Sequence, residues 1–324
     1  MQYVGLNAQK ARNNFRSGVL LCLFPCLVIL LTLLFSVLLV FFTSEGGLNV
    51  DVWEQSLLLV KDMSPYIFGG VLIWFVIAYF ANTSIIRMST GARPLERKEN
   101  KRVYNLVENL CMTQGMSMPK INLLADDSLN AYASGINKST YTVTLSRGII
   151  NKLDDEELEA VIAHELSHIR NNDVRLLIVS IVFVGIFAML TQIAVNVLRF
   201  TPARSRSNNK NGGGMIVIIL IALVVVAIGY FFASLMRFAI SRNREYMADA
   251  GSAEMTRRPY ALAGALRKIA GDPYIEAVKR DDVAQLFIEH PKQKKKDNQL
   301  FSGISGLFAT HPPIEKRIAI LEQF

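Results

Sequence analysis

Four long runs without a charged residue constrain this chain more than any other feature of its sequence. They cover residues 17–44, 63–86, 176–198 and 211–236. A helix needs about 20 mostly apolar residues to cross the hydrocarbon core of a bilayer, and each run reaches that length, although Gln192 makes the third less apolar. The chain is also 51% hydrophobic with a mean hydropathy of +0.30, which is too apolar for an ordinary soluble globule. The runs predict a multi-span helical membrane protein.

Basic residues beside the first two runs predict the orientation. Lys10, Arg12 and Arg16 precede the first run, whereas the loop 45–62 holds one basic residue, Lys61. Because Lys and Arg concentrate in cytoplasmic loops, the N-terminus is expected in the cytoplasm and this loop outside. The basic loop 199–210 disagrees with two full crossings by the third and fourth runs. Either the rule is overridden there, or that hairpin does not fully span.

These runs divide the chain. Residues 1–86 are expected to form an N-terminal membrane anchor with two transmembrane helices, and residues 176–236 a hydrophobic helical hairpin, interpreted as two more. An even number of crossings puts 87–175 and 237–324 on the same, cytoplasmic side, where they are expected to form one domain. The net charge of +8 is assigned to residues flanking the membrane rather than to a nucleic-acid partner, because no finger spacing or RNA-binding signature accompanies it.

The motif His164-Glu165-Leu166-Ser167-His168 is the strongest chemical signal. Positions i and i+4 share one helical face, so the two imidazoles can bind one metal ion, and Glu165 is placed to act as general base on metal-bound water. The chain has only 4 His, and two of them form this motif.

The residues before the motif predict the helix that it needs. Asp154 is a candidate N-cap and Glu157 lies at the third helical position, which is the pattern of a capping box. Leu153 and Leu158 fit the hydrophobic staple around such a cap. A helix is therefore expected to begin at residue 155 and to carry both histidines.

A catalytic zinc ion needs a third protein ligand and an open position. Glu245 is the candidate, because it follows the fourth apolar run and so abuts the same membrane face as the histidines. Asp249 lies four residues later on the same helical face and could accept the N–H of a histidine ligand. Ligands of this kind favour Zn²⁺, one catalytic ion.

These motifs make the chain similar to the HtpX family of bacterial membrane metalloproteases, which is related to the CAAX prenyl proteases. The resemblance covers most of the chain and rests on Asn130-Ala131 and on segments 160–168, 241–246, 248–253, 310–313 and 315–318. It implies zinc at His164, His168 and Glu245, a place in the cytoplasmic membrane, and quality control of misfolded or damaged membrane proteins. The N-terminal arm and the loop 45–62 depart from the family pattern, so no partner or regulatory role is carried over there.

The expected fold is mainly α: a multi-span helical membrane protein with a zincin-type helical metalloprotease domain that carries a small β-sheet. Residues 140–146 have strand composition, are taken as the sheet edge that binds substrate, and are expected to share a sheet with 120–124. His311, Arg242 and Arg244 are candidate donors to the transition state, and Asn130 is a candidate contact to substrate backbone.

The expected activity is membrane-bound zinc endopeptidase, with unfolded membrane proteins and the lipid bilayer as partners. Two alternatives stay open. A CAAX-type prenyl-protein protease would share the catalytic residues but use more spans than the four runs seen here. A non-catalytic membrane adaptor with structural zinc would ordinarily hold its ion with four protein ligands, often Cys, and would not need Glu165. The chain has 3 Cys and no disulfide framework, which fits a reducing compartment.

Overall fold

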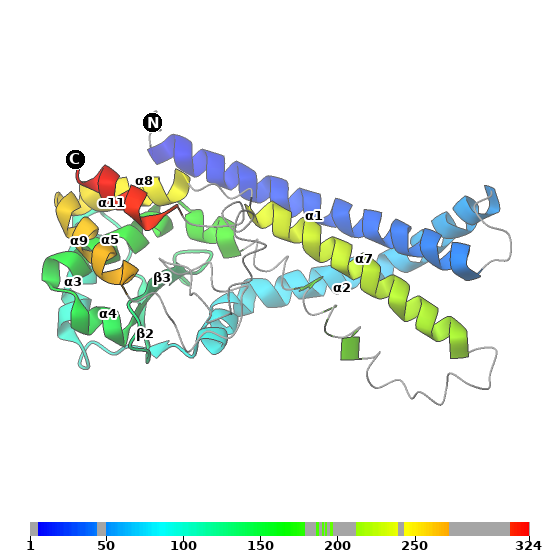
Figure 1. Ribbon diagram of the computed structural model, residues 1–324, viewed down its shortest axis with the longest axis horizontal. Coiled ribbons are helices and arrows are strands. Elements are labelled where there is room, and N and C mark those ends of the chain that lie inside the picture. The colour runs from blue at the N-terminus through cyan, green and yellow to red at the C-terminus, as the bar shows by residue number, and fades with distance from the viewer. Residues whose placement is uncertain are drawn as a thin grey trace. The chain divides into compact units, whose positions relative to one another are not determined.

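A computed structural model describes residues 6–43, 50–178, 186–187, 190, 192, 195–196, 212–238, 243–271 and 312–323 (Figure 1). The chain divides into two compact units. The first contains residues 1–16, 80–178 and 238–324, and the second contains residues 17–79 and 179–237.

The first unit is built around a four-stranded mixed sheet in the order β1-β2-β4-β3. The strands are β1 (Arg93–Pro94), β2 (Lys120–Leu124), β3 (Ala131–Ser134) and β4 (Thr142–Ser146). β2 runs parallel to β4, while β1 pairs with β2 and β3 pairs with β4 in antiparallel register. All residues of β4 are buried, because this strand has a neighbour on each side and helices cover the sheet.

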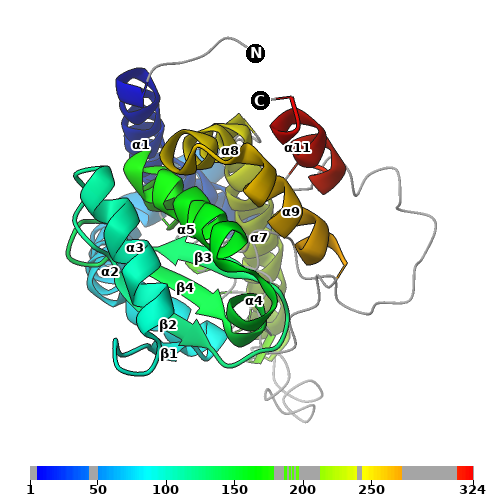
Figure 2. The same ribbon diagram turned by 90° about the vertical axis from the view of Figure 1, so that its left-hand side faces the viewer.

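Six helices, the helical residues 173–178 and the ends of longer helices complete the described part of the first unit. The six helices are α3 (Lys101–Thr113), α4 (Arg147–Lys152), α5 (Asp155–Arg170), α8 (Asn243–Thr256), α9 (Pro259–Ala270) and α11 (Ile314–Leu321). Figure 2 shows α3 and α5 in front of the sheet, with α8 and α9 next to α5. α5 is the centre of this arrangement, since it contacts β3, β4, α3, α8 and α9.

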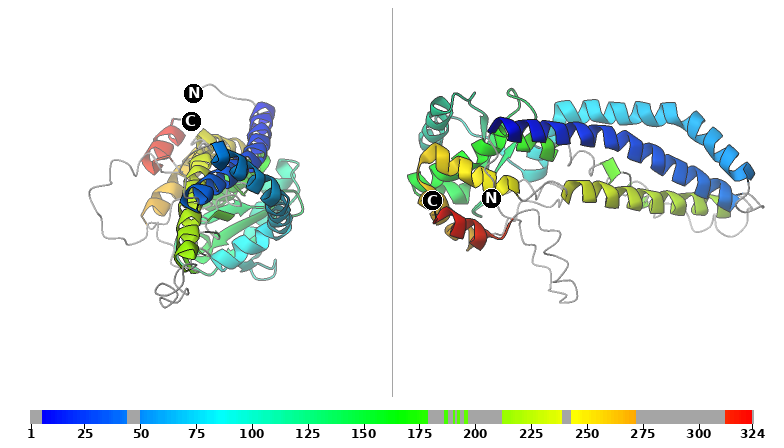
Figure 3. Two further views of the ribbon diagram at one scale, coloured as in Figure 1. Left: turned by 90° about the vertical axis from the view of Figure 1, so that its right-hand side faces the viewer. Right: turned by 90° about the horizontal axis from the view of Figure 1, so that it is seen from above.

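The second unit consists of apolar helices. It contains most of α1 (Leu6–Thr43) and α2 (Val50–Thr90) and nearly all of α7 (Gly212–Phe238), which can be followed as long helices in Figures 1 and 3. The Phe24 and Phe75 rings join α1 to α2 edge to face, with centroids 5.6 Å apart. A Cβ added at Gly229 would lie 2.4 Å from the Phe187 ring, so α7 can approach its neighbours closely only because this residue is glycine.

Two helical segments of the second unit are long and apolar enough to cross a membrane. They are Cys22–Phe42 in α1 and Asp51–Ala81 in α2. In α7 the apolar stretch Ile218–Phe232 is shorter, and most of the third run, 176–198, lies outside the described residues. Among the described residues, length and composition thus identify two candidate spans where the sequence suggested four.

The predicted fold class is confirmed in its broad form, since the chain is mainly helical with a small sheet. The pairing of residues 120–124 with the strand at 140–146 is confirmed as well. The prediction that this second segment forms the sheet edge is wrong, because β3 pairs with β4 on its other side. A strand's own composition does not reveal its neighbours, and here the short strand β3, buried throughout, forms the edge beside β4, while β1 forms the other edge.

Candidate metal centre

The helix that carries the histidine motif is formed by local interactions. The Asp154 carboxylate accepts a hydrogen bond from the Glu157 N–H at 2.9 Å, and the Glu157 carboxylate accepts one from the Asp154 N–H at 3.1 Å. This is the predicted capping box, and the staple residues Leu153 and Leu158 are both buried. α5 therefore starts where the sequence expected it and presents His164 and His168 on one face.

The structure brings three predicted ligands together. The Nε2 atoms of His164 and His168 lie 3.2 Å apart, and Glu245 carboxylate oxygens lie 3.7 Å from each of them. One ligand atom from each residue falls within 4.8 Å of the others. His164 and Glu245 are 1% and 5% exposed, so these three groups face one another inside the protein.

Close packing of two helices delivers Glu245 to the histidines. α8 lies against α5 at small residues: a Cβ added at Gly251 would be 2.4 Å from the Ser167 Oγ, and the Ser252 hydroxyl donates to the Ala160 carbonyl at 2.6 Å. A larger side chain at either position would push the helices apart. Glu245, in the first turn of α8, thus depends on contacts one to two turns further along that helix.

A buried charge network supports His164. The Asp249 carboxylate lies 2.9 Å from His164 Nδ1. The Arg317 guanidinium of α11 holds both oxygens of Asp249, at 2.9 Å from Nε and 2.7 Å from Nη2. Its Nη1 lies 3.7 Å from the Glu245 carboxylate, and Arg317 is only 1% exposed. One arginine from the last described helix therefore contacts both the third ligand and the partner of the first.

A tight turn supports His168. α5 ends at Arg170, and Asn172 then adopts a φ of 61°, a left-handed conformation that asparagine tolerates better than most residues. This turn reverses the chain so that the Asp173 carboxylate lies 3.0 Å from His168 Nδ1. Arg244 donates to the Asp173 carbonyl at 3.4 Å. Both histidines therefore face a carboxylate through Nδ1 and the metal position through Nε2.

The two histidines differ in their affinity for protons. Burial lowers the pKa of His164, which Asp249 offsets only in part. Burial would also lower the pKa of His168, but the negative charges of Glu245, Asp173 and Glu165 outweigh it and raise the pKa to about 9. His168 therefore takes up a proton more readily than His164, and its Nε2 faces the Nε2 of His164 at 3.2 Å. A proton and a metal ion compete for the same position.

Glu165 is a buried carboxyl on the same helix. Burial, with the nearby charge of Glu245, raises its pKa to about 7, while His168, Arg317 and a hydrogen bond from the Ala133 backbone oppose the shift. A group with this pKa exchanges protons readily near neutral pH, as a general base must. The contact with Ala133 also ties Glu165 to β3, the strand at the edge of the sheet.

The other predicted site residues have different positions. Asn130 is buried, and its Oδ1 accepts a hydrogen bond from the Ala131 N–H at the start of β3. Arg244 is 8% exposed and donates to the Asp173 carbonyl, so it supports the site indirectly, through the turn that holds His168. His311 and Arg242 lie outside the described residues, and their suggested contacts stay predictions.

Sequence reasoning missed Asp173 and Arg317. Asp173 could have been suspected from Asn171-Asn172, which favours a chain reversal at the end of the helix. Arg317 offered no local signal, because an arginine in an amphipathic helix is ordinarily a surface residue. Its role depends entirely on the packing of α11 against α8 and α9.

The residues present fit a zinc ion. Four ligands held tetrahedrally at zinc–nitrogen distances of about 2.0–2.1 Å lie about 3.3 Å from one another. The two Nε2 atoms, 3.2 Å apart, already match that spacing. Two imidazoles and one carboxylate are the ligand set of a catalytic zinc site, which leaves one position for water or substrate. A helix with this motif and a carboxylate from a second helix defines a centre of the metallopeptidase class.

A family profile and two relatives of this chain agree with that class. The profile of Peptidase family M48 matches residues 97–324. A protein named "Protease HtpX homolog" from Bacteroides fragilis is 67% identical over 100% of both chains. Another of that name, from Lactobacillus acidophilus, is 34% identical over 98% of this chain and 99% of its own. The crystal structure of S. mikatae Ste24p aligns with a TM-score of 0.46 and 18% identity, over 79% of this chain and 58% of that chain.

The chain therefore belongs to peptidase family M48 and, within it, to the HtpX-like metalloproteases.

Proposed function

We propose that this protein is a membrane-bound zinc endopeptidase that hydrolyses peptide bonds of misfolded or damaged membrane proteins, with Glu165 as its general base. The observation that carries the proposal is the site itself. Two histidines and Glu245 converge, while a fourth group, Glu165, lies beside them with a pKa raised to about 7. A purely structural zinc site has no use for such a carboxyl, which argues against a non-catalytic adaptor.

His164, His168 and Glu245 would hold the zinc ion. When bound, zinc supplies Lewis acidity, which lowers the pKa of water and polarises a carbonyl group. Glu165 takes a proton from the attacking water and delivers it to the leaving amine. The carboxyl is suited to both transfers because its burial raises its pKa toward neutral pH. Asp249 and Asp173 keep the proton of each imidazole on Nδ1, so that each Nε2 stays available for the metal.

Substrate would bind as an added strand along β3. The Ser146 N–H donates to the Asn130 carbonyl, and ladder bonds alternate along an antiparallel pair, so Ala131 and Ala133 turn their backbone groups away from β4. The Ala131 N–H already donates to Asn130 Oδ1, so substrate would displace that side chain or pair with the carbonyl. Among the described residues no strand pairs with this side of β3. An extended peptide there would pass Glu165, which already contacts Ala133. Recognition through backbone groups suits unfolded segments of varied sequence.

The membrane part of the proposal rests on the apolar unit. α1 and α2 each contain a candidate span, and Lys10, Arg12 and Arg16 precede the first of them. We therefore place the protein in the bacterial cytoplasmic membrane with its catalytic unit facing the cytoplasm. Orientation can be tested with a maleimide that does not cross membranes, after replacement of the natural cysteines. Glu54→Cys should be labelled from outside intact cells, and Lys138→Cys only after lysis. The reverse pattern would contradict the orientation.

The hydrolytic role is tested by Glu165→Gln, which keeps the metal ligands and removes the base. Full-length protein in detergent, loaded with zinc, is incubated with an unfolded soluble protein and with a destabilised membrane protein. We expect the substitution to lower kcat by about 100-fold or more while bound zinc stays equimolar. Glu156→Gln, on an exposed turn of the same helix, is the matched control and should cleave like wild type. Equal cleavage by wild type and Glu165→Gln would exclude Glu165 as the base. A preference for the soluble protein over the membrane protein would argue against membrane quality control.

A further inference from the structure

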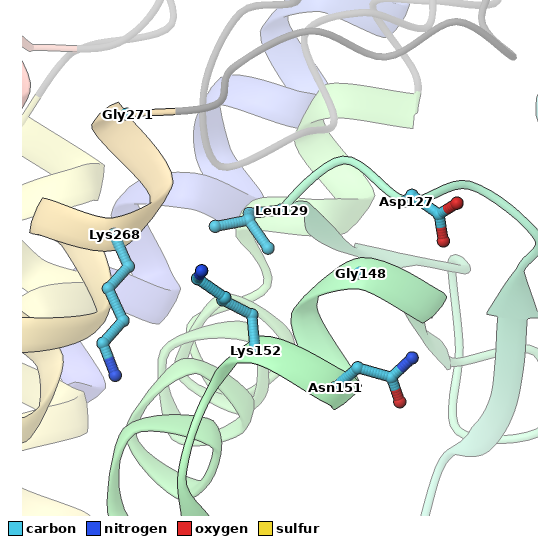
Figure 4. A pocket seen from close by; sticks show the side chains of 7 residues that line it. All are labelled: Asp127, Leu129, Gly148, Asn151, Lys152, Lys268 and Gly271. Carbon is cyan, nitrogen blue, oxygen red and sulfur yellow. The ribbon is translucent and has the colours of Figure 1, made fainter.

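A pocket lies at the beginning of the edge strand, apart from the metal ligands. It has a volume of about 440 Å³ and is lined by residues of the loop before β3, of α4 and of the end of α9. Figure 4 shows Lys268 on α9 and Lys152 on α4 on two sides of this hollow, with Leu129 near Lys152. We call it the lysine pocket. Its lining residues are Asp127, Leu129, Gly148, Asn151, Lys152, Lys268 and Gly271.

The position of the pocket relates it to the proposed substrate strand. Leu129 comes four residues before Ala133, whose backbone contacts Glu165. In an extended chain that separation is about 13 Å. Antiparallel pairing is the more stable of the two ways to add a strand. An antiparallel substrate runs from Ser134 toward Leu129, so the residues after its scissile bond reach the pocket three or four positions later.

The charges around the pocket leave one cation uncompensated. Arg147 holds both oxygens of Asp127, at 2.7 and 2.9 Å. Lys268 contacts the Glu157 carboxylate at 2.5 Å. Among the described residues Lys152 has no acidic partner, and Asn151 beside it adds an amide that can donate hydrogen bonds. The pocket therefore carries net positive charge and polar donors, which suit an anion.

We infer that the lysine pocket binds a carboxylate of the substrate three or four residues beyond the scissile bond, through Lys152 and with Lys268 as a second cation. This rests on the proposed endopeptidase function and on the placement of substrate along β3. The carboxylate comes either from an acidic side chain or from the C-terminus of the substrate. Both sources present the same group to Lys152, and both are negatively charged at neutral pH.

Peptides with one fixed cleavage site test this inference. Position three or position four after the scissile bond carries Glu, Gln or Lys in longer peptides with an amidated C-terminus. Further pairs of peptides end at either position with a free or an amidated C-terminus. With full-length wild-type protein, Glu should give a kcat/KM about threefold to fivefold above Gln and further above Lys, mainly through KM. Lys152→Glu should lower the Glu-over-Lys ratio by about tenfold, and 0.5 M salt should shrink the wild-type preference.

Matched variants and a binding assay separate the possible outcomes. Lys101→Glu, at the exposed start of α3, changes the net charge equally and should leave the preference unchanged. If amidation of the short peptide lowers kcat/KM, the pocket binds the C-terminal carboxylate. If the longer amidated peptides are still cleaved faster with Glu than with Gln, the pocket binds the acidic side chain. The same peptides, labelled, are bound to Glu165→Gln protein and followed by fluorescence anisotropy. If the peptides bind in a charge-dependent way but wild type cleaves none of them, the endopeptidase proposal is wrong while the inference about the lysine pocket is supported. Identical ratios in wild type and Lys152→Glu, or an equal shift in Lys101→Glu, overturn the pocket.

Discussion

The two histidines of the candidate metal centre are held by residues that lie at very different distances from them along the sequence. His168 is held by Asp173, five residues later and across a single turn. His164 is held by Asp249 on another helix, and Asp249 is held in turn by Arg317, 68 residues further on. The same chemical task, fixing an imidazole through its Nδ1, is performed on one side by a local turn and on the other by tertiary packing.

This difference has consequences for stability and for metal binding. The His164 side consists of buried charges that are stable only as pairs. Replacing one of them leaves its partner buried and unpaired, which is strongly destabilising. The His168 side depends on a turn and one carboxylate, and the same carboxylate helps to raise the pKa of His168. We therefore expect the His164 side to govern folding and the His168 side to govern how zinc binding depends on pH.

Arg317→Leu should have the largest effect. It leaves the Asp249 carboxylate buried without its bidentate partner and removes the cation near Glu245, so we expect a loss of about 3–5 kcal/mol in the free energy of unfolding, measured by thermal unfolding in detergent. Lys316→Leu, at the exposed neighbouring residue, is the control. The double variant Asp249→Leu, Arg317→Leu should recover part of the stability but none of the zinc affinity. A wild-type melting curve for Arg317→Leu would contradict this account.

Asp249→Asn and Asp173→Asn compare the two sides directly. Each replaces a carboxylate that orients a ligand, and such changes ordinarily lower metal affinity by about 10-fold to 100-fold. We expect Asp249→Asn to lower zinc affinity more, because it also removes the carboxylate that the buried Arg317 holds through two hydrogen bonds. Competition with a chelating dye gives both affinities. An equal loss in the two variants would mean that Arg317 adds nothing to the His164 side.

The pH dependence of zinc binding should come from His168. Its pKa of about 9 means that a proton must leave before zinc binds, so affinity should rise by up to about tenfold per pH unit until about pH 9 and then level off. That proton stabilises the metal-free fold fully below about pH 6.5, and the contribution is lost as pH rises through 9. Asp173→Asn should move the plateau to lower pH, and Asp249→Asn should not. Titrations of zinc affinity against pH decide this, and an unmoved plateau in Asp173→Asn would refute it.

Asp154→Ala should have the smallest effect, because it removes an interaction between residues only three positions apart. Loss of the capping box is expected to cost about 1 kcal/mol of stability. Zinc affinity should stay within about twofold, because α5 remains packed by α8 and α9. Thermal unfolding and zinc titration measure the two quantities. A large loss of zinc affinity would show that the start of α5 also positions its histidines.

Features that depend on short separations along the chain could be predicted from the sequence. The capping box of α5, the shared face of His164 and His168, and the four-residue spacing of Glu245 and Asp249 all follow from helical geometry, which links residues three and four positions apart. The candidate spans in α1 and α2 are likewise recognisable in the sequence, because each is a run of consecutive apolar residues long enough to cross a bilayer.

Contacts between residues far apart in the chain depend instead on how the helices and strands pack. The segment 140–146 was recognisable as a strand, but its neighbours β2 and β3 were chosen by pairing across the sheet, and this made β3 the edge next to Glu165. Arg317 became a buried partner of Asp249 because α11 packs against α8. Contacts of this kind leave no periodic signal, since they depend on the burial of whole helices and on the strong preference of a buried charge for a partner.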